Sequence, residues 1–213
     1  MGLKERSASA TWLSLSRGKF IIKNDDGSKT EFQALEGLVV GLGFQDAEYE
    51  GKKYRKLYLA IADGGDVFKV SFDAASGYGR QTLMKLPNCD LSQPLELSPS
   101  YKEDGAKKST GMFLSQCGNS IKQKWTRDNP GDLPQMEQVI FKGEIKWDDT
   151  SQMKYLEDYV THYLCPVVLA NAGRANPRAN GRSDEAEHEQ TSHDPHEQES
   201  AAFPAPGDGD VPF

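Results

Sequence analysis

Two alternating segments joined by a tight turn restrict the fold of this chain more than any other feature. In residues 53–62, Leu57, Leu59 and Ile61 alternate with polar or smaller side chains, and residues 66–72 repeat the pattern after an Asp-Gly-Gly turn. A period of two residues places successive side chains on opposite faces of a β-strand. The two segments therefore predict an antiparallel β-hairpin with one buried face and one solvated face.

Further strands are expected on both sides of this hairpin. A run rich in Leu and Val precedes it, with two internal glycines that predict a β-bulge or a sharp coil, and a short helix ended by Pro87 follows it. Three strands, a short helix and two strands are the element order of a five-stranded antiparallel OB barrel, so we expect a mainly β, OB-like fold. The expected strands are residues 36–44, 53–62, 66–72, 91–98 and 110–125, with the helix in residues 74–88 between the third and fourth. A short hairpin or a bent strand is expected before them, in residues 11–23.

The pattern changes in the C-terminal third of the chain. Residues 138–147 predict an additional strand, and residues 149–164 predict a helix that Pro166 ends. Beyond it apolar residues become rare, and such a segment cannot bury enough surface to offset its ordering entropy. We therefore expect one folded domain over residues 1–170 and a disordered acidic tail over residues 171–213.

The chain is acidic overall, but its charge is concentrated at one end. It has 25 basic and 32 acidic residues among 213, which gives a net charge of -7. Nine of the acids lie in residues 183–213, where Lys and Arg are absent, so the first 182 residues carry 25 basic and 23 acidic groups. A near-neutral body joined to a polyanionic tail predicts a tail that contacts partners.

The tail ends in an acidic and apolar tip, made of Asp208, Asp210, Val211, Pro212 and Phe213. This tip resembles that of the bacterial single-stranded DNA-binding protein family, whose members end in a run of aspartates followed by Ile-Pro-Phe. The resemblance implies that the terminal Phe fills an apolar pocket on replication and repair enzymes while the aspartates meet a basic rim. Here valine replaces isoleucine, and a glycine splits the acidic run.

The folded part contains a stretch that interleaves cations with aromatic rings. Binding of a single strand needs basic groups for the phosphates and flat rings for the bases. If Leu57 points inward, Tyr54, Lys56 and Tyr58 share the outward face of one strand, beside Lys69 on the next. With basic clusters elsewhere, the expected DNA-binding residues are Lys52, Lys53, Tyr54, Arg55, Lys56, Tyr58, Lys69, Lys107, Lys108, Lys122, Lys124 and Trp125.

No motif for catalysis or cofactor binding stands out, and we expect a protein that is not an enzyme and holds no cofactor or metal. The three cysteines, Cys89, Cys117 and Cys165, form no CxxC pair and favour free thiols in a reducing compartment. No segment has the pattern of a signal peptide or a membrane span. We therefore expect a cytoplasmic location, in a bacterium or a phage-infected cell.

These features favour one function and leave alternatives open. The leading hypothesis is a protein that coats single-stranded DNA during replication, recombination or repair and recruits enzymes through its acidic tip. A different β-sheet scaffold, such as the Whirly type, would serve the same function. The alternative function is a β-barrel protein-interaction module that uses the tail without nucleic acid. A homo-oligomer is possible, but the sequence does not specify its size.

Overall fold

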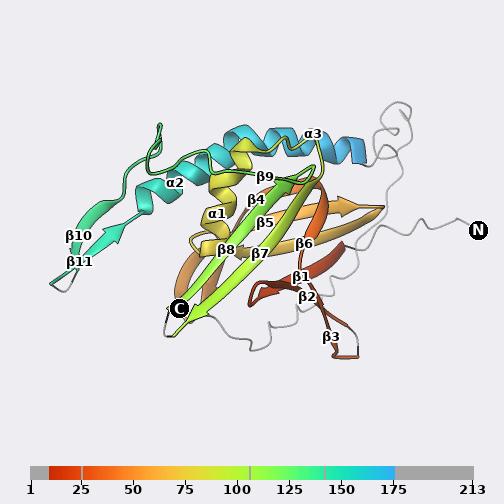
Figure 1. Ribbon diagram of the computed structural model, residues 1–213, viewed down its shortest axis with the longest axis horizontal. Helices are drawn as coiled ribbons and strands as arrows, with labels where there is room; N and C mark the ends of the chain where they lie inside the picture. Colours follow the sequence, from red (N-terminus) through yellow and green to blue (C-terminus); the bar gives the residue numbers. More distant parts are fainter. Residues whose placement is uncertain (1–9, 25, 106, 142, 176–213) are drawn as a thin grey trace, which may run out of the picture. The chain divides into compact units, whose positions relative to one another are not determined.

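The computed structural model describes residues 10–24, 26–105, 107–141 and 143–175 (Figure 1). Strands dominate these residues, and helices lie between and after them. The strands are β1 (Ala10–Ser16), β2 (Lys19–Lys23), β3 (Lys29–Phe32), β4 (Leu35–Tyr49), β5 (Lys52–Asp63), β6 (Asp66–Asp73), β7 (Leu95–Asp104), β8 (Lys107–Gln116), β9 (Asn119–Ser120), β10 (Glu137–Phe141) and β11 (Glu144–Asp148). The helices are α1 (Gly77–Lys85), a 3-10 turn (Leu86–Asn88), α2 (Thr150–Tyr159), a π-helical turn (Val160–Leu164) and α3 (Cys165–Ala175).

The described strands form two sheets. The larger has nine strands in the order β3-β2-β1-β6-β5-β4-β7-β8-β9, and the smaller is the β10–β11 ribbon. The predicted hairpin is confirmed, since β5 and β6 pair antiparallel with Tyr58 opposite Ser71. The predicted bulge is also present, because the β4–β5 register shifts between Val39 and Gly41.

The mainly β fold with added helices is confirmed, but the described residues form an open sheet and not a closed five-stranded barrel. The outer edge of β6 is occupied by β1, which runs parallel to it over Ala10 to Leu13. The sheet continues through β2 and β3 on that side and ends at β9 on the other. The N-terminal strands therefore extend the sheet where a barrel would close.

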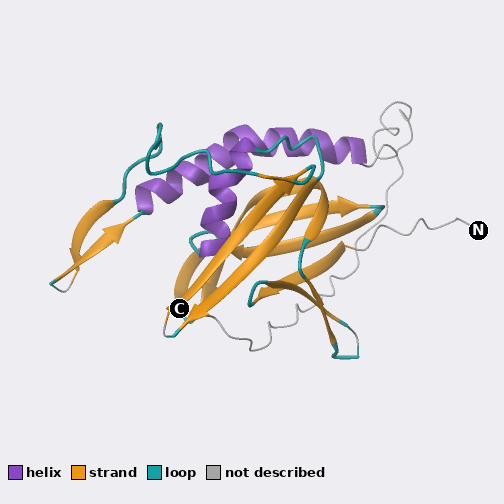
Figure 2. Cartoon of the chain, viewed as in Figure 1, coloured by secondary structure: helices purple, strands orange, loops and turns teal. Residues whose placement is uncertain are grey.

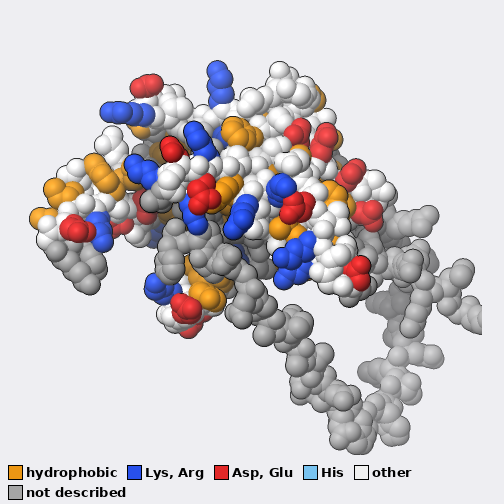
Figure 3. Space-filling view, turned by 60° about the horizontal axis from the view of Figure 1, so that its bottom comes forward, with side chains coloured by type: hydrophobic (Ala, Val, Ile, Leu, Met, Phe, Trp, Pro, Cys, Tyr) orange, Lys and Arg blue, Asp and Glu red, His pale blue; other side chains and the backbone are white. Residues whose placement is uncertain are grey.

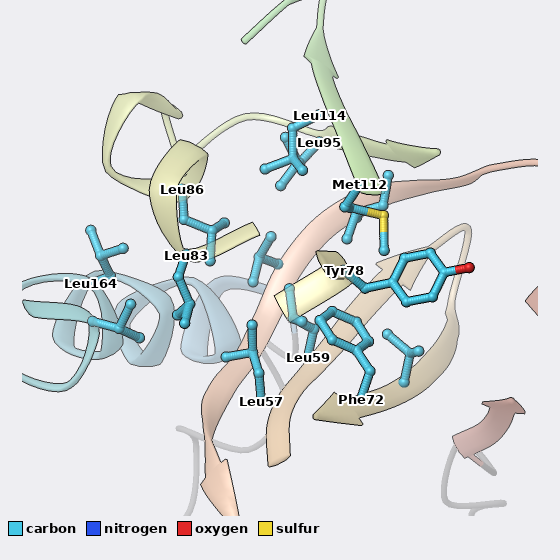
Figure 4. Packing of buried hydrophobic residues seen from close by; sticks show 14 of the residues in the cluster. Leu57, Leu59, Phe72, Tyr78, Leu83, Leu86, Leu95, Met112, Leu114 and Leu164 are labelled. Carbon is cyan, nitrogen blue, oxygen red and sulfur yellow. The ribbon is translucent and has the colours of Figure 1, made fainter. Parts of the chain in front are cut away.

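The buried face of this sheet carries the core. Leu57, Leu59 and Phe72 of the central hairpin pack with Leu83 of α1 and with Met112 of β8 (Figure 4). Burying each of these side chains contributes about 1.5–3 kcal/mol. The core therefore joins the hairpin, α1 and the β7–β8 pair into one unit.

The helix expected after the third strand is confirmed as α1. Ser76 caps it, because its Oγ accepts a hydrogen bond from the Gly79 N–H at 3.2 Å. The α-helix ends at Lys85, and Pro87 stands in the 3-10 turn that follows. The order of three strands, a helix and two strands thus holds for β4 to β8.

Several expected boundaries were wrong. The fourth strand begins at Leu95 and runs through the expected polar loop to Asp104, and the fifth ends at Gln116. The strand predicted for residues 138–147 is a hairpin, because Gly143 takes a left-handed φ of 82° and reverses the chain.

The C-terminal helix also differs from its prediction. It continues past Pro166 to Ala175. A π-helical turn ends at Leu164, two residues before the proline, and the Cys165 N–H bonds the Val160 carbonyl five residues back. The predicted tail begins inside α3, and from residue 176 onward it lies outside the described residues.

Candidate nucleic-acid interface

The outer face of β5 carries the aromatic and basic side chains that the alternation predicts. Leu57 and Leu59 are fully buried, whereas Tyr54, Lys56 and Tyr58 are partly exposed on the opposite face. The Lys56 ammonium lies 5.6 Å from the centre of the Tyr54 ring, within cation–π range. The expected arrangement of these three side chains is therefore present.

Trp12 joins this face from β1, which sequence reasoning did not anticipate. In the parallel β1–β6 register Trp12 stands opposite Lys69, and the Lys69 ammonium lies 5.7 Å from the indole centre. The Trp12 and Tyr58 rings are 6.0 Å apart at 52°. Trp12 is 54% exposed, which is unusual for so large an apolar side chain. We call Trp12, Tyr54, Lys56, Tyr58 and Lys69 the sheet-face cluster.

Two glycines of β4 lie next to Tyr58 on the same face. Gly41 stands opposite Ala60 and Gly43 opposite Tyr58. A Cβ at Gly41 would come within 2.9 Å of the Ala60 Cβ, so the fold itself requires a glycine there. A Cβ at Gly43 would meet no atom within 4 Å, and its φ is not left-handed. Gly43 therefore leaves bare backbone in β4 opposite Tyr58, although neither its φ nor a close contact requires a glycine there.

Arg55 lies on the other face of β5 and takes part in holding the fold together. Its Nη1 is 2.6 Å from Oδ1 of Asp46, and its Nε is 3.3 Å from Oε2 of Glu157 on α2. The hydrogen bond to Asp46 raises the pKa of Arg55 above its usual value. Arg55 thus links β4, β5 and α2, and it is not part of the sheet-face cluster.

Most basic candidates on the strands stand opposite acids, including Lys56 of the sheet-face cluster, which pairs with Asp73. Lys53 pairs with Glu48, and Lys52 pairs with Tyr49 beside the β4–β5 turn. Lys107 pairs with Asp104 and Lys108 with Glu103, and the Lys108 Nζ is 3.8 Å from Glu103 Oε1. Carboxylates across the strand offset the local positive charge, so these lysines add less to an anion site than their number suggests.

The candidates at residues 122–125 form a junction between a loop and α2. Trp125 is 2% exposed, its indole N–H donates to Asp132 at 2.9 Å, and it packs edge-on against Tyr159 with ring centres 5.3 Å apart. Lys124 donates to the Tyr159 hydroxyl at 2.7 Å. Lys122 is exposed nearby. Trp125 is thus a core residue in this conformation, and its ring offers no surface for stacking.

Basic and acidic side chains are intermixed on the face shown in Figure 3, in keeping with the small charge excess of the first 182 residues. The tip residues Asp208, Asp210, Val211, Pro212 and Phe213 lie outside the described residues.

Neither a metal site nor a membrane-spanning helix occurs in the part of the chain that the structure describes. No group of His, Cys, Asp or Glu side chains there could hold a metal ion. No helix among those residues is long and apolar enough to cross a membrane.

Comparisons with protein-family models, with curated proteins and with solved structures find no match to this chain. The sheet-face cluster is therefore interpreted from its own geometry.

Proposed function

We propose that this protein binds single-stranded nucleic acid, foremost single-stranded DNA, on the sheet-face cluster. The observation that carries the proposal is the exposed Trp12 ring beside the partly exposed Tyr58 ring, with the Lys69 ammonium over the indole. Exposed rings on a sheet stack with bases, each worth about 1–3 kcal/mol, and neighbouring ammonium groups attract phosphates.

The preference for an unpaired strand follows from the shape of the cluster. A ring that lies on a strand face reaches a base only when the base is splayed out of a helix. Duplex DNA hides its bases in the stack and offers only groove edges and phosphates. Since the body carries only a small positive excess, stacking has to supply much of the affinity.

The strand order supports an OB-type scaffold for this function. Strands β4, β5 and β6 form a meander, α1 follows, and β7 returns to pair with β4 before β8. In OB folds the face of the second and third strands binds oligonucleotides. In this chain those strands are β5 and β6, which supply Tyr54, Lys56, Tyr58 and Lys69 to the cluster.

The acidic tip completes the proposed role. Its resemblance to the single-stranded DNA-binding protein family leads us to propose that Phe213 and the residues before it recruit replication and repair proteins. The nine carboxylates of residues 183–213 compete with DNA for basic groups on the same molecule.

The test is fluorescence anisotropy with labelled oligo(dT) and a duplex of equal length at two salt concentrations. We expect tighter binding of the single strand, weakened by salt, and a loss of about 5- to 150-fold on Tyr58→Ala or Trp12→Ala. Phe113→Ala is the matched control, because Phe113 is an exposed strand aromatic with the Lys85 ammonium 5.1 Å from its ring, but it lies outside the cluster. No binding by the wild-type chain would discard the proposal.

A further inference from the structure

The β4–β5 hairpin continues beyond the sheet-face cluster, and its two faces differ in charge. Its outer face from the cluster to the turn consists of Gly41, Gly43, Gln45, Ala47 and Tyr49 of β4 and of Lys52, Tyr54, Lys56, Tyr58 and Ala60 of β5. Lys52 and Lys56 are the charged residues among these, so this face has cations and no acid. In the same part of the hairpin, Asp46 and Glu48 stand on the reverse face, and Glu50 lies in the turn.

The reverse face of the hairpin is joined to the helices. Arg55 on that face lies 2.6 Å from Asp46 and 3.3 Å from Glu157 of α2. Figure 2 shows the helices on one side of the larger sheet, where residues of α1 and α2 share a core with Leu57. The outer face of the hairpin therefore points away from α2.

Aromatic rings recur along this outer face from the cluster to the turn. In that order they are Trp12, Tyr58, Tyr54 and Tyr49. Trp12 is level with Ala60 of β5, because both stand beside Lys69, and Tyr49 is level with Lys52. Tyr49 is 50% exposed. The stretch of β5 from Ala60 to Lys52 measures about 27 Å at about 3.4 Å per residue, so the line of rings extends well past the cluster.

We propose that the bound single strand lies lengthwise along β5, from Trp12 to Tyr49. The end of the hairpin is then a further subsite, in which Tyr49 stacks on a base and Lys52 meets a phosphate. This inference rests on the proposed function and adds to it the direction and the extent of the bound strand. A strand that crossed β5 at Tyr58 would leave Tyr49 without a base, because Lys52, opposite Tyr49, lies about 20 Å further along β5.

Charge and side-chain size favour the lengthwise path. Next to the β5 rings, β4 carries Gly43 and Ala47, whose small size leaves room for bases. A strand on this side of the rings passes Lys56 and then Lys52 without meeting a carboxylate on the outer face of the hairpin. A path across the sheet at Lys56 instead meets Asp73 of β6, which repels phosphate.

Two neighbouring lysines provide a matched test of the face that binds. Lys52 and Lys53 carry the same charge next to the same turn, but Lys53 stands on the reverse face opposite Glu48. In anisotropy titrations with oligo(dT) of about sixteen nucleotides, Lys52→Gln should weaken binding and reduce the slope of log affinity against log salt by about 0.7. Lys53→Gln should change neither. Equal effects of the two substitutions would overturn the proposal.

Tyr49→Ala tests the added stacking subsite. It should weaken binding of the same oligonucleotide at least about fivefold, and Tm should not fall because the ring is half exposed at the end of the hairpin. Wild type that binds no oligonucleotide would remove the proposed function and this inference together. Wild type that binds and is weakened by Tyr58→Ala, but not by Tyr49→Ala, would leave the proposed function standing and refute the lengthwise path.

Photo-crosslinking reads the direction of the strand. An oligo(dT) of about eight nucleotides matches the line of rings at a stacked spacing of about 3.4 Å per nucleotide. With one 5-iodouracil placed at either end, the lengthwise path predicts that one end crosslinks to Trp12 and the other to Tyr49, as identified by mass spectrometry. Crosslinks from both ends that gather at Trp12 and Tyr58 would contradict it.

Discussion

Replacing Gly43 with valine separates a requirement of the fold from a requirement of binding. Gly43 stands inside β4 opposite Tyr58, has an ordinary φ, and has open space where a Cβ would be. Glycine in a strand interior is destabilising unless a bulge, a bend or a close approach needs it. No described atom makes that approach, so the proposed function assigns it to a base of the bound strand.

Gly43→Val is expected to raise stability and to lower affinity. A β-branched side chain gains about 1 kcal/mol over glycine at a tolerant strand position, which corresponds to about 2–4 °C in Tm for a domain of this size. The added methyl groups exclude a base from the backbone beside Tyr58. Losing one stacked base costs about 1–3 kcal/mol, a weakening of about 5- to 150-fold.

The assay combines thermal unfolding with oligo(dT) anisotropy on the same samples. Ser109→Val is the control, since it adds the same side chain at an exposed β8 position outside the sheet-face cluster. It should leave binding unchanged. Two results would refute the reasoning: a lower Tm for Gly43→Val, or unchanged binding by Gly43→Val when Tyr58→Ala weakens it.

Three further predictions concern charge. Deleting residues 183–213 removes nine carboxylates, so in anisotropy titrations it should tighten oligo(dT) binding at low salt but not at high salt. Equal affinities of the truncated and the full-length protein at low salt would exclude competition by the tail. Changing Lys56 and Lys69 together to glutamine should reduce the slope of log affinity against log salt by about 1.4, and an unchanged slope would show that neither meets a phosphate. Asp132 accepts hydrogen bonds from Tyr155 and Trp125, which hold its pKa below the ordinary 3.8. The ionised carboxylate therefore stabilises the fold above pH 3.8, and this stabilisation is lost as the pH falls through the lowered pKa. Asp132→Asn should lower Tm at pH 7, and the difference in Tm from wild type should shrink below pH 3.8. A difference in Tm that is independent of pH would contradict this.

Local patterns predicted the centre of the fold. The alternation around Leu57 and Leu59 sets which face of β5 is buried, and Pro87 limits α1, so both features depend only on neighbouring residues. The same alternation correctly grouped Tyr54 and Tyr58 on the outer face.

Long-range contacts account for what the sequence could not reveal. Trp12 reaches the cluster through a parallel pairing with a strand more than fifty residues away, and parallel partners are not readable from local periodicity. Trp125 is buried because Asp132 and Tyr159 of later segments surround it. The sequence indicates the position of Trp12 only indirectly. Trp12 is the neighbour of the buried Leu13, so its ring lies on the opposite face of the strand.

The parallel pairing of β1 with β6 has a consequence for how the binding face assembles. The edge that receives β1 does not exist until residue 73 has been synthesised, although β1 leaves the ribosome first. Contacts between segments far apart in sequence carry a large loop-closure entropy, and short pairings open more easily than long central ones. β1 is paired with β6 over four residues, so we expect Trp12 to be the last member of the cluster to dock and the first to detach. Amide hydrogens of residues 10–13 should therefore exchange faster than those of β5, and bound single strand should slow their exchange.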